Sequence, residues 1–276
     1  MIKLKSLHLE NFRGFSDTTI EFGKNITCIA GINGAGKSSC LEALSKSLHA
    51  LLRTVLNPKF ENVNFQDIKE SDINVNSEEK YASVTLSFVY NEMNLSQKID
   101  SNEELIKNFQ SEIISSNIKN DFTIVSYYSV NRSELDIDVS VESEKDLSEK
   151  TESVASSLVA VTHYKDFFKW FRDREDRENQ EIVYRYKKQE NGAGYEDYAL
   201  KAVRIAISTL LPNISQMTVD RKKLVVSVNK KDSTLDFATL SDGEKAIITL
   251  FGDIARRLAI ANEKMENPLE GNGIIL

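Results

Sequence analysis

Residues 31–38 read GINGAGKS and match the pattern G-x-x-x-x-G-K-[ST] without deviation. The residues before this pattern, 25–30 (NITCIA), form a short apolar run that predicts a strand buried on both faces. After the pattern, leucines recur at helical spacing from Ser38 until Asn57-Pro58, which predicts a helix that ends there. Strand, glycine loop and helix in this order are the context that identifies a phosphate-binding loop.

The glycine loop predicts a site for the phosphates of a nucleotide. Glycines allow the backbone N–H groups of residues 33–38 to turn toward phosphate oxygens, and the helix N-terminus adds the positive end of its dipole. Lys37 would reach the β and γ phosphates, and the Ser38 hydroxyl would ligate Mg²⁺, so both are predicted catalytic residues. The alternative, a glycine turn that only caps a helix, is disfavoured by the context. The predicted nucleotide-binding residues of the loop are Asn33, Gly34, Ala35, Gly36, Lys37, Ser38 and Ser39.

A second motif, LSDGEK at residues 240–245, opens the last predicted helix. Ser241 and Glu244 have the spacing of a capping box, so the motif has a purely structural interpretation. A serine and a glycine backbone at a helix N-terminus also form an anion site that can hold a γ-phosphate. The two interpretations are compatible. Because the glycine loop already predicts a nucleotide site, we expect the motif to be an anion site as well as a helix cap.

Composition restricts the class of protein. The chain has 276 residues, of which 41% are hydrophobic and 28% charged, as in an ordinary globular protein of one large or two small domains. No run approaches the roughly 18 to 20 apolar residues of a membrane span, and the first 15 residues alternate, unlike a signal peptide. Cys28 and Cys40, both in apolar contexts, predict buried thiols in a reducing compartment. We therefore expect a cytoplasmic protein with no membrane partner.

With a net charge of −7, the protein as a whole does not attract nucleic acid. Binding of nucleic acid would need a local basic groove. Two basic clusters, residues 185–188 and 221–223, could contact nucleic-acid phosphates or could be solvated loop charges. The charged helix 170–178 has three opposite-charge pairs at i,i+4, which are typical of a solvated helix. The alternative is a partner-facing surface anchored by Trp170 and Phe171.

The remaining elements are predicted from periodicity and turn signals. Residues 1–22 predict a hairpin, and residues 142–157, which are almost devoid of apolar side chains, predict a solvated, mobile stretch. The other predicted elements are strands at 84–90, 122–128, 215–219 and 224–228, and helices at 103–116, 163–181 and 198–211.

The motifs together resemble those of a known class of ATPases. NFRGF at residues 11–15, the glycine loop, a long insertion, LSDGEK and the final GIIL resemble ATPases of the RecF, SMC and Rad50 type. The resemblance implies an α/β fold, a P-loop NTPase of the ABC (RecF/SMC head) type, with a mixed sheet, helices on both faces and an α/β insertion. It implies an ATPase core in residues 1–56 and 235–276, separated by an insertion with helical and β parts at 57–234.

The resemblance also implies how the motifs work. In this class, LSGGQ-like residues of one subunit contact the γ-phosphate held by another subunit, so ATP joins a homodimer or a higher oligomer. Carried over, Ser241, Asp242, Gly243 and Glu244 act in trans, and Arg13 lies near the nucleotide. Asp242 and Glu244 depart from LSGGQ and favour the RecF and OLD-like branches over transporter ATPases. Asn131 and Arg132 follow a predicted strand and either sense the γ-phosphate, as Q-loop residues do, or form an ordinary turn.

Three longer stretches resemble a narrower group. YYSVNRS (127–133), FFKWFRDREDRENQE (167–181) and residues 240–276 look like PtuA-type ATPases, which occur beside HNH nucleases in Septu antiphage systems and in some retrons. The resemblance implies an ATPase that uses ATP and Mg²⁺, oligomerises, and regulates a partner nuclease in antiviral defence. The implied partners are a PtuB-like HNH nuclease and a retron reverse transcriptase with its RNA and DNA.

In PtuA-type proteins, GIIL would continue into the two acidic residues of a Walker B motif, which bind Mg²⁺ through water and polarise the attacking water. Neither acid is in the sequence, so we expect a truncated chain that binds ATP better than it hydrolyses it. Two other functions stay open: a RecF-like DNA-repair ATPase, and the ATPase half of an OLD-type Toprim nuclease. A metabolic P-loop kinase is disfavoured because it would leave LSDGEK as a coincidence.

Overall fold

The computed structural model describes residues 2–56, 68–90, 92–101, 124–128, 164–188, 194–223, 225–231 and 233–276. These residues form two compact units. The first contains the described residues up to Tyr127 together with residues 274–276, and the second contains Tyr128 and the described residues from 164 to 273. The predicted helix 103–116, the sensor pair Asn131 and Arg132, and the stretch 142–157 lie outside the described residues.

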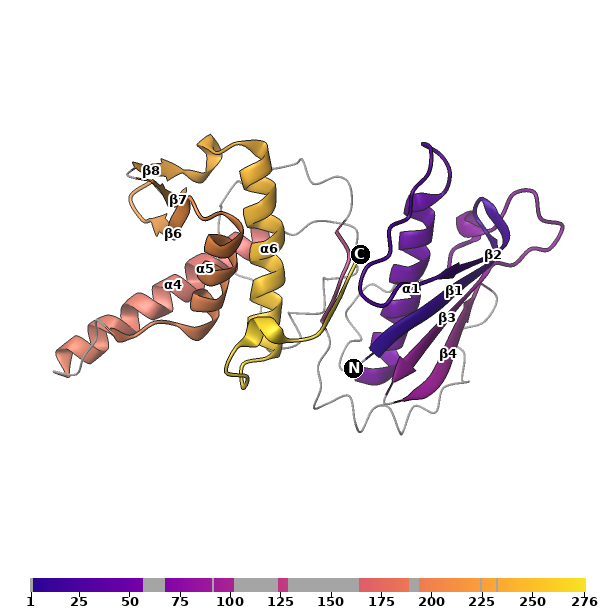
Figure 1. The fold of residues 1–276 in the computed structure, drawn as a ribbon, viewed down its shortest axis with the longest axis horizontal. Helices are drawn as coiled ribbons and strands as arrows, with labels where there is room; N and C mark the ends of the chain where they lie inside the picture. Colours follow the sequence, from indigo (N-terminus) through magenta and orange to yellow (C-terminus); the bar gives the residue numbers. More distant parts are fainter. Residues whose placement is uncertain are drawn as a thin grey trace. The chain divides into compact units, whose positions relative to one another are not determined.

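The first unit is built on an antiparallel sheet covered by a helix (Figure 1). In spatial order the strands are β2 (Phe15–Glu21), β1 (Ile2–Phe12), β3 (Ser83–Tyr90) and β4 (Met93–Asp100). Helix α1 (Lys37–Leu56) packs on β3 and β4. Alternate strand residues face α1, and its leucines at helical spacing face them. The buried residues include Leu7, Leu9, Val84, Leu86, Phe88, Leu44, Leu48 and Leu51.

The predicted N-terminal hairpin and the predicted strand 84–90 are confirmed as β1, β2 and β3, and the helix after the glycine loop is confirmed as α1. The predicted buried strand at residues 25–30 is wrong. The structure places no strand there, and Ile26 and Ile32 are 86% and 82% exposed. A strand becomes buried on both faces only within a sheet that is itself covered, and residues 24–32 have no partner strand among the described residues. Cys28 is exposed with this segment, contrary to prediction, whereas Cys40 is buried.

Two short strands pair in a separate small sheet. Strand β5 (Ile124–Ser126) is the described part of the strand predicted at 122–128, and β9 (Gly273–Ile275) is the final apolar run. The N–H of Leu276 donates to the carbonyl oxygen of Ser126 at 2.8 Å. The two strands are far apart in the sequence, so their pairing joins the last residues to a segment near the middle of the chain.

In its described residues, the second unit packs three α-helices with a small antiparallel sheet (Figure 1). The helices are α4 (Tyr164–Lys187), α5 (Tyr198–Leu210) and α6 (Asp242–Ala261). The strands, in order, are β6 (Ile214–Asp220), β7 (Val225–Lys230) and β8 (Ser233–Asp236), and short 3₁₀ helices lie at Phe237–Thr239 and Pro268–Glu270. The predicted helices 163–181 and 198–211 and the strands 215–219 and 224–228 are confirmed, with small shifts at their ends.

Aromatic side chains of α4 fill the core of the second unit. The Phe167 and Phe168 ring centroids lie 5.0 Å apart, and Phe168 meets Phe237 edge-on at 4.8 Å. A side chain at Gly252 of α6 would come within 2.5 Å of the Phe167 ring, so this glycine permits the close approach of the two helices. Trp170 and Phe171 are buried in the same core, so the alternative in which they anchor a partner-facing surface is wrong.

Candidate functional site

The glycine loop lies at the N-terminus of α1, as the sequence predicts. Gly34 and Gly36 have φ values of +83° and +88°, in the left-handed region that glycine adopts without strain. Residues 31–35 and Ser38 are exposed, and the first N–H groups of α1 have no partner within the helix. The loop therefore presents backbone donors and a positive helix end to solvent, which is the arrangement that binds phosphate.

Lys37, the first residue of α1, folds back over its own loop. Its Nζ atom donates to the carbonyl oxygens of Gly31 and Ile32 at 2.9 and 2.6 Å. These contacts hold the ammonium group at the loop, where a phosphate oxygen could replace a carbonyl as its acceptor. The first residue of β2, Phe15, supports the loop from the side, because a Cβ atom at Gly36 would come within 2.6 Å of its ring.

Arg13, in the tight turn between β1 and β2, is held by carboxylates. Its Nη2 atom pairs with Glu42 on α1 at 2.6 Å, and its Nε donates to Asp72 at 2.9 Å. The buried Asp72 also accepts from Lys46 on α1 at 3.1 Å and from the N–H of Lys69 at 3.0 Å. These contacts tie the β1–β2 turn and the 3₁₀ helix Glu70–Asp72 to α1.

The pKa values of this cluster follow from the pairing. Burial would raise the pKa of Asp72, but the hydrogen bonds from the Lys69 N–H, Lys46 and Arg13 outweigh it and lower the pKa below its ordinary value. The pKa of Arg13 is raised, because its bonds to Glu42 and Asp72 outweigh the opposing effect of burial. The shifts in the pKa of Asp72 and Arg13 both favour the charged forms, so this cluster is an ionic clamp beside the glycine loop.

The LSDGEK motif opens α6, and its serine is the N-cap of the helix. The N–H of Glu244 donates to Ser241 Oγ at 3.4 Å, and Glu244 Oε2 accepts from the Ser241 N–H at 3.3 Å, so the predicted capping box is confirmed. The Ser241 hydroxyl also donates to Glu244 at 3.0 Å. Lys230, the last residue of β7, pairs with the other oxygen of Glu244 at 2.7 Å. This ion pair is the first cause that lowers the pKa of Glu244 to about 2, and the bonds to Ser241 add to it.

A buried charge cluster lies on the same helix and was missed by sequence reasoning. Asp253 pairs with Arg256 at 2.7 Å and with Arg257 at 2.8 Å, and it accepts from the Tyr128 hydroxyl at 2.8 Å. Burial would raise the pKa of Asp253, but the two guanidinium groups lower it to about 2. The available signal was the i, i+3, i+4 spacing of one acid and two arginines on the apolar side of an amphipathic helix.

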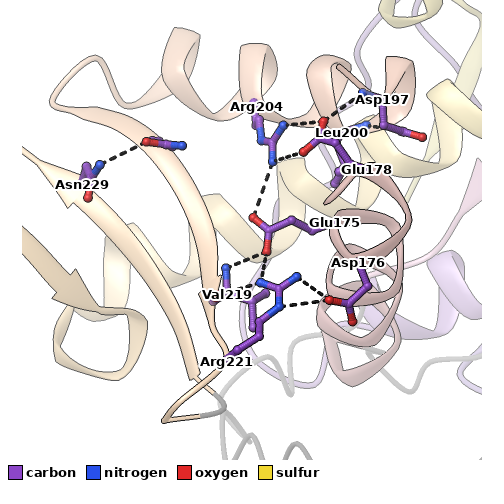
Figure 2. Close-up of polar contacts among 10 residues, drawn as sticks. Glu175, Asp176, Glu178, Asp197, Leu200, Arg204, Val219, Arg221 and Asn229 are labelled. Carbon is purple, nitrogen blue, oxygen red and sulfur yellow. Dashed lines mark hydrogen bonds and ion pairs between the residues drawn. The ribbon is translucent and has the colours of Figure 1, made fainter. Parts of the chain in front are cut away.

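A second, partly buried ionic network joins α4 to its neighbours (Figure 2). Arg204 of α5 lies between Glu178, at 3.0 Å, and Glu175, at 3.6 Å. Arg221, directly after β6, bonds Glu175 and lies 2.7 Å from Asp176. The carboxylates of Asp176 and Glu178 thus pair with other elements, whereas the sequence predicted pairs along α4. Arg221, one of the cations considered for nucleic acid, has a structural role here.

The structure gathers some of the predicted site residues and separates others by unit. Arg13 and the loop residues lie in the first unit, and the LSDGEK motif lies in the second. The predicted nucleotide-binding residues of the loop, which all lie in the first unit, are Asn33, Gly34, Ala35, Gly36, Lys37, Ser38 and Ser39. Within the ranges given above, no group of three or more His, Cys, Asp or Glu side chains is placed to hold a metal ion.

Comparison with known proteins places the chain in a family. A family model described as an AAA domain matches residues 6–266. The chain belongs to this AAA domain family. A Rad50 DNA double-strand break repair ATPase of Archaeoglobus fulgidus is 40% identical over 98 residues, which cover 36% of this chain and 10% of that protein. The AAA domain therefore has the P-loop ATPase fold of the ABC and SMC type that the sequence predicted.

Two relatives match along the whole chain. The Retron Vc95 probable ATPase of Vibrio cholerae is 30% identical and the Retron Ec83 probable ATPase of Escherichia coli is 27% identical, both over 100% of this chain. The chain spans 64% and 62% of their lengths. Among solved structures, the recombination mediator RecF with ATP aligns at a TM-score of 0.44 and 14% identity, covering 99% of this chain and 85% of RecF. In the described part of the chain, no helix is both long and apolar enough to cross a membrane.

Proposed function

We propose that this AAA domain binds ATP on the glycine loop of one subunit and that the LSDGEK motif of a second subunit completes the site. The observation that carries the proposal is the loop itself: two glycines at positive φ, Lys37 held over the loop, and an exposed helix N-terminus directly behind it. An exposed loop backbone, a lysine ammonium group and the positive end of a helix suit a triphosphate better than any neutral ligand.

In this proposal each residue has a separate task. Backbone N–H groups of residues 33–38 bind the β and γ phosphates, and Lys37 neutralises their charge. The exposed Ser38 hydroxyl holds Mg²⁺, which supplies charge neutralisation between the phosphates. Arg13 lies beside the nucleotide and holds the turn between β1 and β2, which supports the loop. Asn131 and Arg132 sense the γ-phosphate, as the resemblance to this class implies.

The second subunit contributes Ser241, Asp242, Gly243 and Glu244 in trans. Ser241 and Gly243 lie at the start of α6, where a hydroxyl and a helix N-terminus are available to an anion. ATP would then stabilise a homodimer or a larger oligomer by neutralising charge between two subunits. We propose that residues 1–56 and 235–276 form the ATPase core and that residues 57–234 are an insertion.

We propose that the full-length protein is a cytoplasmic ATPase of the PtuA type in an antiviral defence system. The two retron ATPases that match over the whole chain support this assignment. Its partners are then a PtuB-like HNH nuclease, which the ATPase regulates, and a retron reverse transcriptase with its RNA and DNA. The Rad50 matches favour a second candidate, a RecF-like DNA-repair ATPase. An OLD-type Toprim nuclease is the third.

A nucleotide-binding measurement tests the first step. Fluorescent ATP should bind the wild-type chain with Mg²⁺, and Lys37→Ala should abolish the binding and the ATP-linked increase in molecular mass measured by light scattering. Lys24→Ala is the matched control, because Lys24 is an exposed lysine of the same unit outside the loop. Assembly that persists unchanged in Lys37→Ala at saturating ATP would contradict the proposal.

A mixing experiment tests the action in trans. Neither Lys37→Ala nor Ser241→Ala should assemble with ATP alone, because each lacks one half of every composite site. A mixture of the two should recover ATP-linked dimers, since a mixed dimer retains one complete site. A mixture that stays monomeric would contradict the arrangement in trans.

Purification of the full-length protein with its neighbouring genes expressed separates the candidate partners. A stoichiometric HNH nuclease would support the defence function. Purification alone with tight, salt-sensitive binding of duplex DNA would favour the repair ATPase. A Toprim domain within the same polypeptide would favour the OLD type.

A further inference from the structure

Helix α4 extends beyond the core that it helps to build. One row of its residues, spaced by three or four, faces the rest of the unit. Burial along this row decreases steadily: Phe171, Glu175 and Glu178 are buried, Ile182 is half-buried, and Tyr186 is 58% exposed. Figure 1 shows the last turns of α4 extending away from the other elements of the second unit.

This protruding end carries large side chains that the core does not need. Tyr184 and Val183 are both 51% exposed, in addition to Tyr186. Three large exposed side chains, two of them aromatic, thus lie within four consecutive residues of the helix. The last two turns of α4 and the residue that follows them, residues 181–188, are called the α4 tip below.

The α4 tip is also positively charged, although the whole chain has a net charge of −7. It contains Arg185, Lys187 and Lys188 against one carboxylate, Glu181, which pairs with Arg185 at 2.8 Å. Cations already lie on aromatic rings here: Lys188 Nζ is 4.4 Å from the Tyr184 ring centroid, and the Arg185 guanidinium is 4.5 Å from that of Tyr195. Alternating cations and exposed rings suit a ligand that offers both phosphates and flat bases.

We propose that the α4 tip binds single-stranded nucleic acid. Unpaired bases stack on the exposed rings of Tyr184 and Tyr186. Lys187 and Lys188 pair with the phosphates on either side. This site is separate from the ATP site and does not depend on the function proposed above.

Geometry and charge favour this ligand over two others. Tyr184 and Tyr186 are two residues apart and therefore lie on different sides of the helix, where a flexible single strand can contact both. A duplex is rigid and keeps its bases stacked on one another, so it offers neither ring a base. A second copy of this chain in a symmetric dimer would place one tip against the other, and the like charges would repel.

Fluorescence anisotropy of a labelled oligonucleotide tests the proposal. The probe is a single-stranded DNA of mixed sequence and about 20 nucleotides, longer than the roughly 4 to 16 nucleotides of one such site. The double variant Tyr184→Ala/Tyr186→Ala should weaken binding at least about tenfold, because stacking on each ring is lost. Both side chains are exposed, so the variant should keep the wild-type circular dichroism spectrum and melting temperature.

Charge variants and a matched control complete the test. Lys187→Gln/Lys188→Gln should weaken binding and reduce the slope of log affinity against log salt by about 1.4, or about 0.7 for each phosphate contact. Lys222→Gln/Lys223→Gln removes the same charge from the exposed turn between β6 and β7 and should leave the affinity and the slope unchanged. The annealed duplex of the same sequence should bind at least about tenfold more weakly than the single strand.

Several results would overturn the proposal. No binding at low salt would do so, and so would equal loss in the tip and control charge variants, which would indicate general electrostatic attraction. Unchanged affinity in the tyrosine variant would show that the rings do not contact bases. A tyrosine variant with a smaller sedimentation coefficient in the absence of DNA, and unchanged DNA affinity, would instead identify the tip as a self-association surface.

Discussion

Arg13 is bonded to Asp72 through both its backbone and its side chain. The Arg13 N–H donates to the Asp72 carbonyl oxygen at 2.6 Å, and its Nε donates to the Asp72 carboxylate at 2.9 Å. Arg13 has a φ of +48°, a region that costs a non-glycine residue about 1 kcal/mol or more. The double attachment stabilises this strained turn, and the next element, with Phe15, supports the glycine loop. Asp72 is therefore linked to the glycine loop through Arg13 and Phe15.

Replacing Asp72 by alanine should destabilise the first unit by about 3 kcal/mol, because it removes the carboxylate that Arg13 and Lys46 share in a buried position. Urea denaturation followed by circular dichroism measures the change. Asp17→Ala is the control, since Asp17 is an exposed carboxylate on β2, and its removal should cost less than about 0.5 kcal/mol. Equal stability of the two variants would contradict the clamp.

The pH dependence of stability should change with the same substitution. The pKa of Asp72 is lowered in the folded protein, so its contribution is complete above the unfolded value of about 3.9 and is lost as the pH falls through the lower, folded value. Wild-type stability should therefore decrease more steeply than that of Asp72→Ala between about pH 4 and pH 3. Urea midpoints measured across this range give the comparison.

Gly36→Ala should abolish ATP binding and destabilise the loop. The residue has a φ of +88°, and a Cβ atom would come within 2.6 Å of the Phe15 ring. Alanine is strained at this positive φ and its Cβ atom would clash with the ring, so the loop must change its backbone conformation or displace Phe15. Fluorescent ATP titration measures the loss. Gly14→Ala is the control, because a Cβ atom there meets nothing within 4 Å; ATP affinity that is equal in the two variants would contradict the prediction.

Gly243→Ala should separate folding from assembly. A Cβ atom at Gly243 meets nothing within 4 Å, and alanine in the first turn of α6 should leave stability unchanged or raise it by up to about 1 kcal/mol. If the glycine backbone approaches a γ-phosphate of another subunit, the same methyl group should prevent ATP-linked dimerisation. Thermal melting and light scattering with ATP measure the two effects. A stable variant that assembles as well as the wild type would contradict the proposed role of Gly243.

Asp253→Ala should be among the most damaging substitutions in the second unit. It would leave the buried guanidinium groups of Arg256 and Arg257 without the carboxylate they share, at a cost of about 3 to 5 kcal/mol. Tyr128→Phe removes only one hydrogen bond to this carboxylate and should cost about 1.5 kcal/mol. Chemical denaturation gives both values. Asp242→Ala on the same helix is the control, because the Asp242 side chain is 98% exposed; a loss as large as that of Asp253→Ala would argue against the buried cluster.

Local patterns in the sequence predicted the elements that local forces determine. The glycine loop, the start of α1 and the capping box of Ser241 depend on residues within four positions of one another, and all are found as expected. Strands β4 and β8 were missed because their sequences, MNLSQKID and STLD, are largely polar and are held by their neighbours in the sheet.

Pairing between distant residues was not predictable from the sequence. The acids of α4 have arginines at i,i+4, but Asp176 and Glu178 pair with Arg221 and Arg204, which come from other elements. Spacing along a helix identifies which residues can pair, whereas the elements that pack beside the helix decide which do. The run at 25–30 has the composition of a buried strand, but composition does not supply the neighbouring strands that burial requires.

The ion pair between Lys230 of β7 and Glu244 of α6 can be tested through the pKa of Glu244. Its pKa of about 2 is due first to the ion pair with Lys230 and then to the hydrogen bonds from Ser241. Because the folded pKa is depressed, these contacts stabilise the helix start above pH 4.5 and are lost as the pH falls toward 2. Lys230→Gln should therefore raise the Glu244 pKa toward 4.5, so NMR of its side-chain carboxyl carbon should show protonation between about pH 6 and pH 3, where the wild-type carboxylate stays mostly ionised. Lys231→Gln removes the same charge one residue away and should leave the titration unchanged. An equal shift in both variants would mean that general charge, and not the contact with Lys230, holds the carboxylate that bonds Ser241.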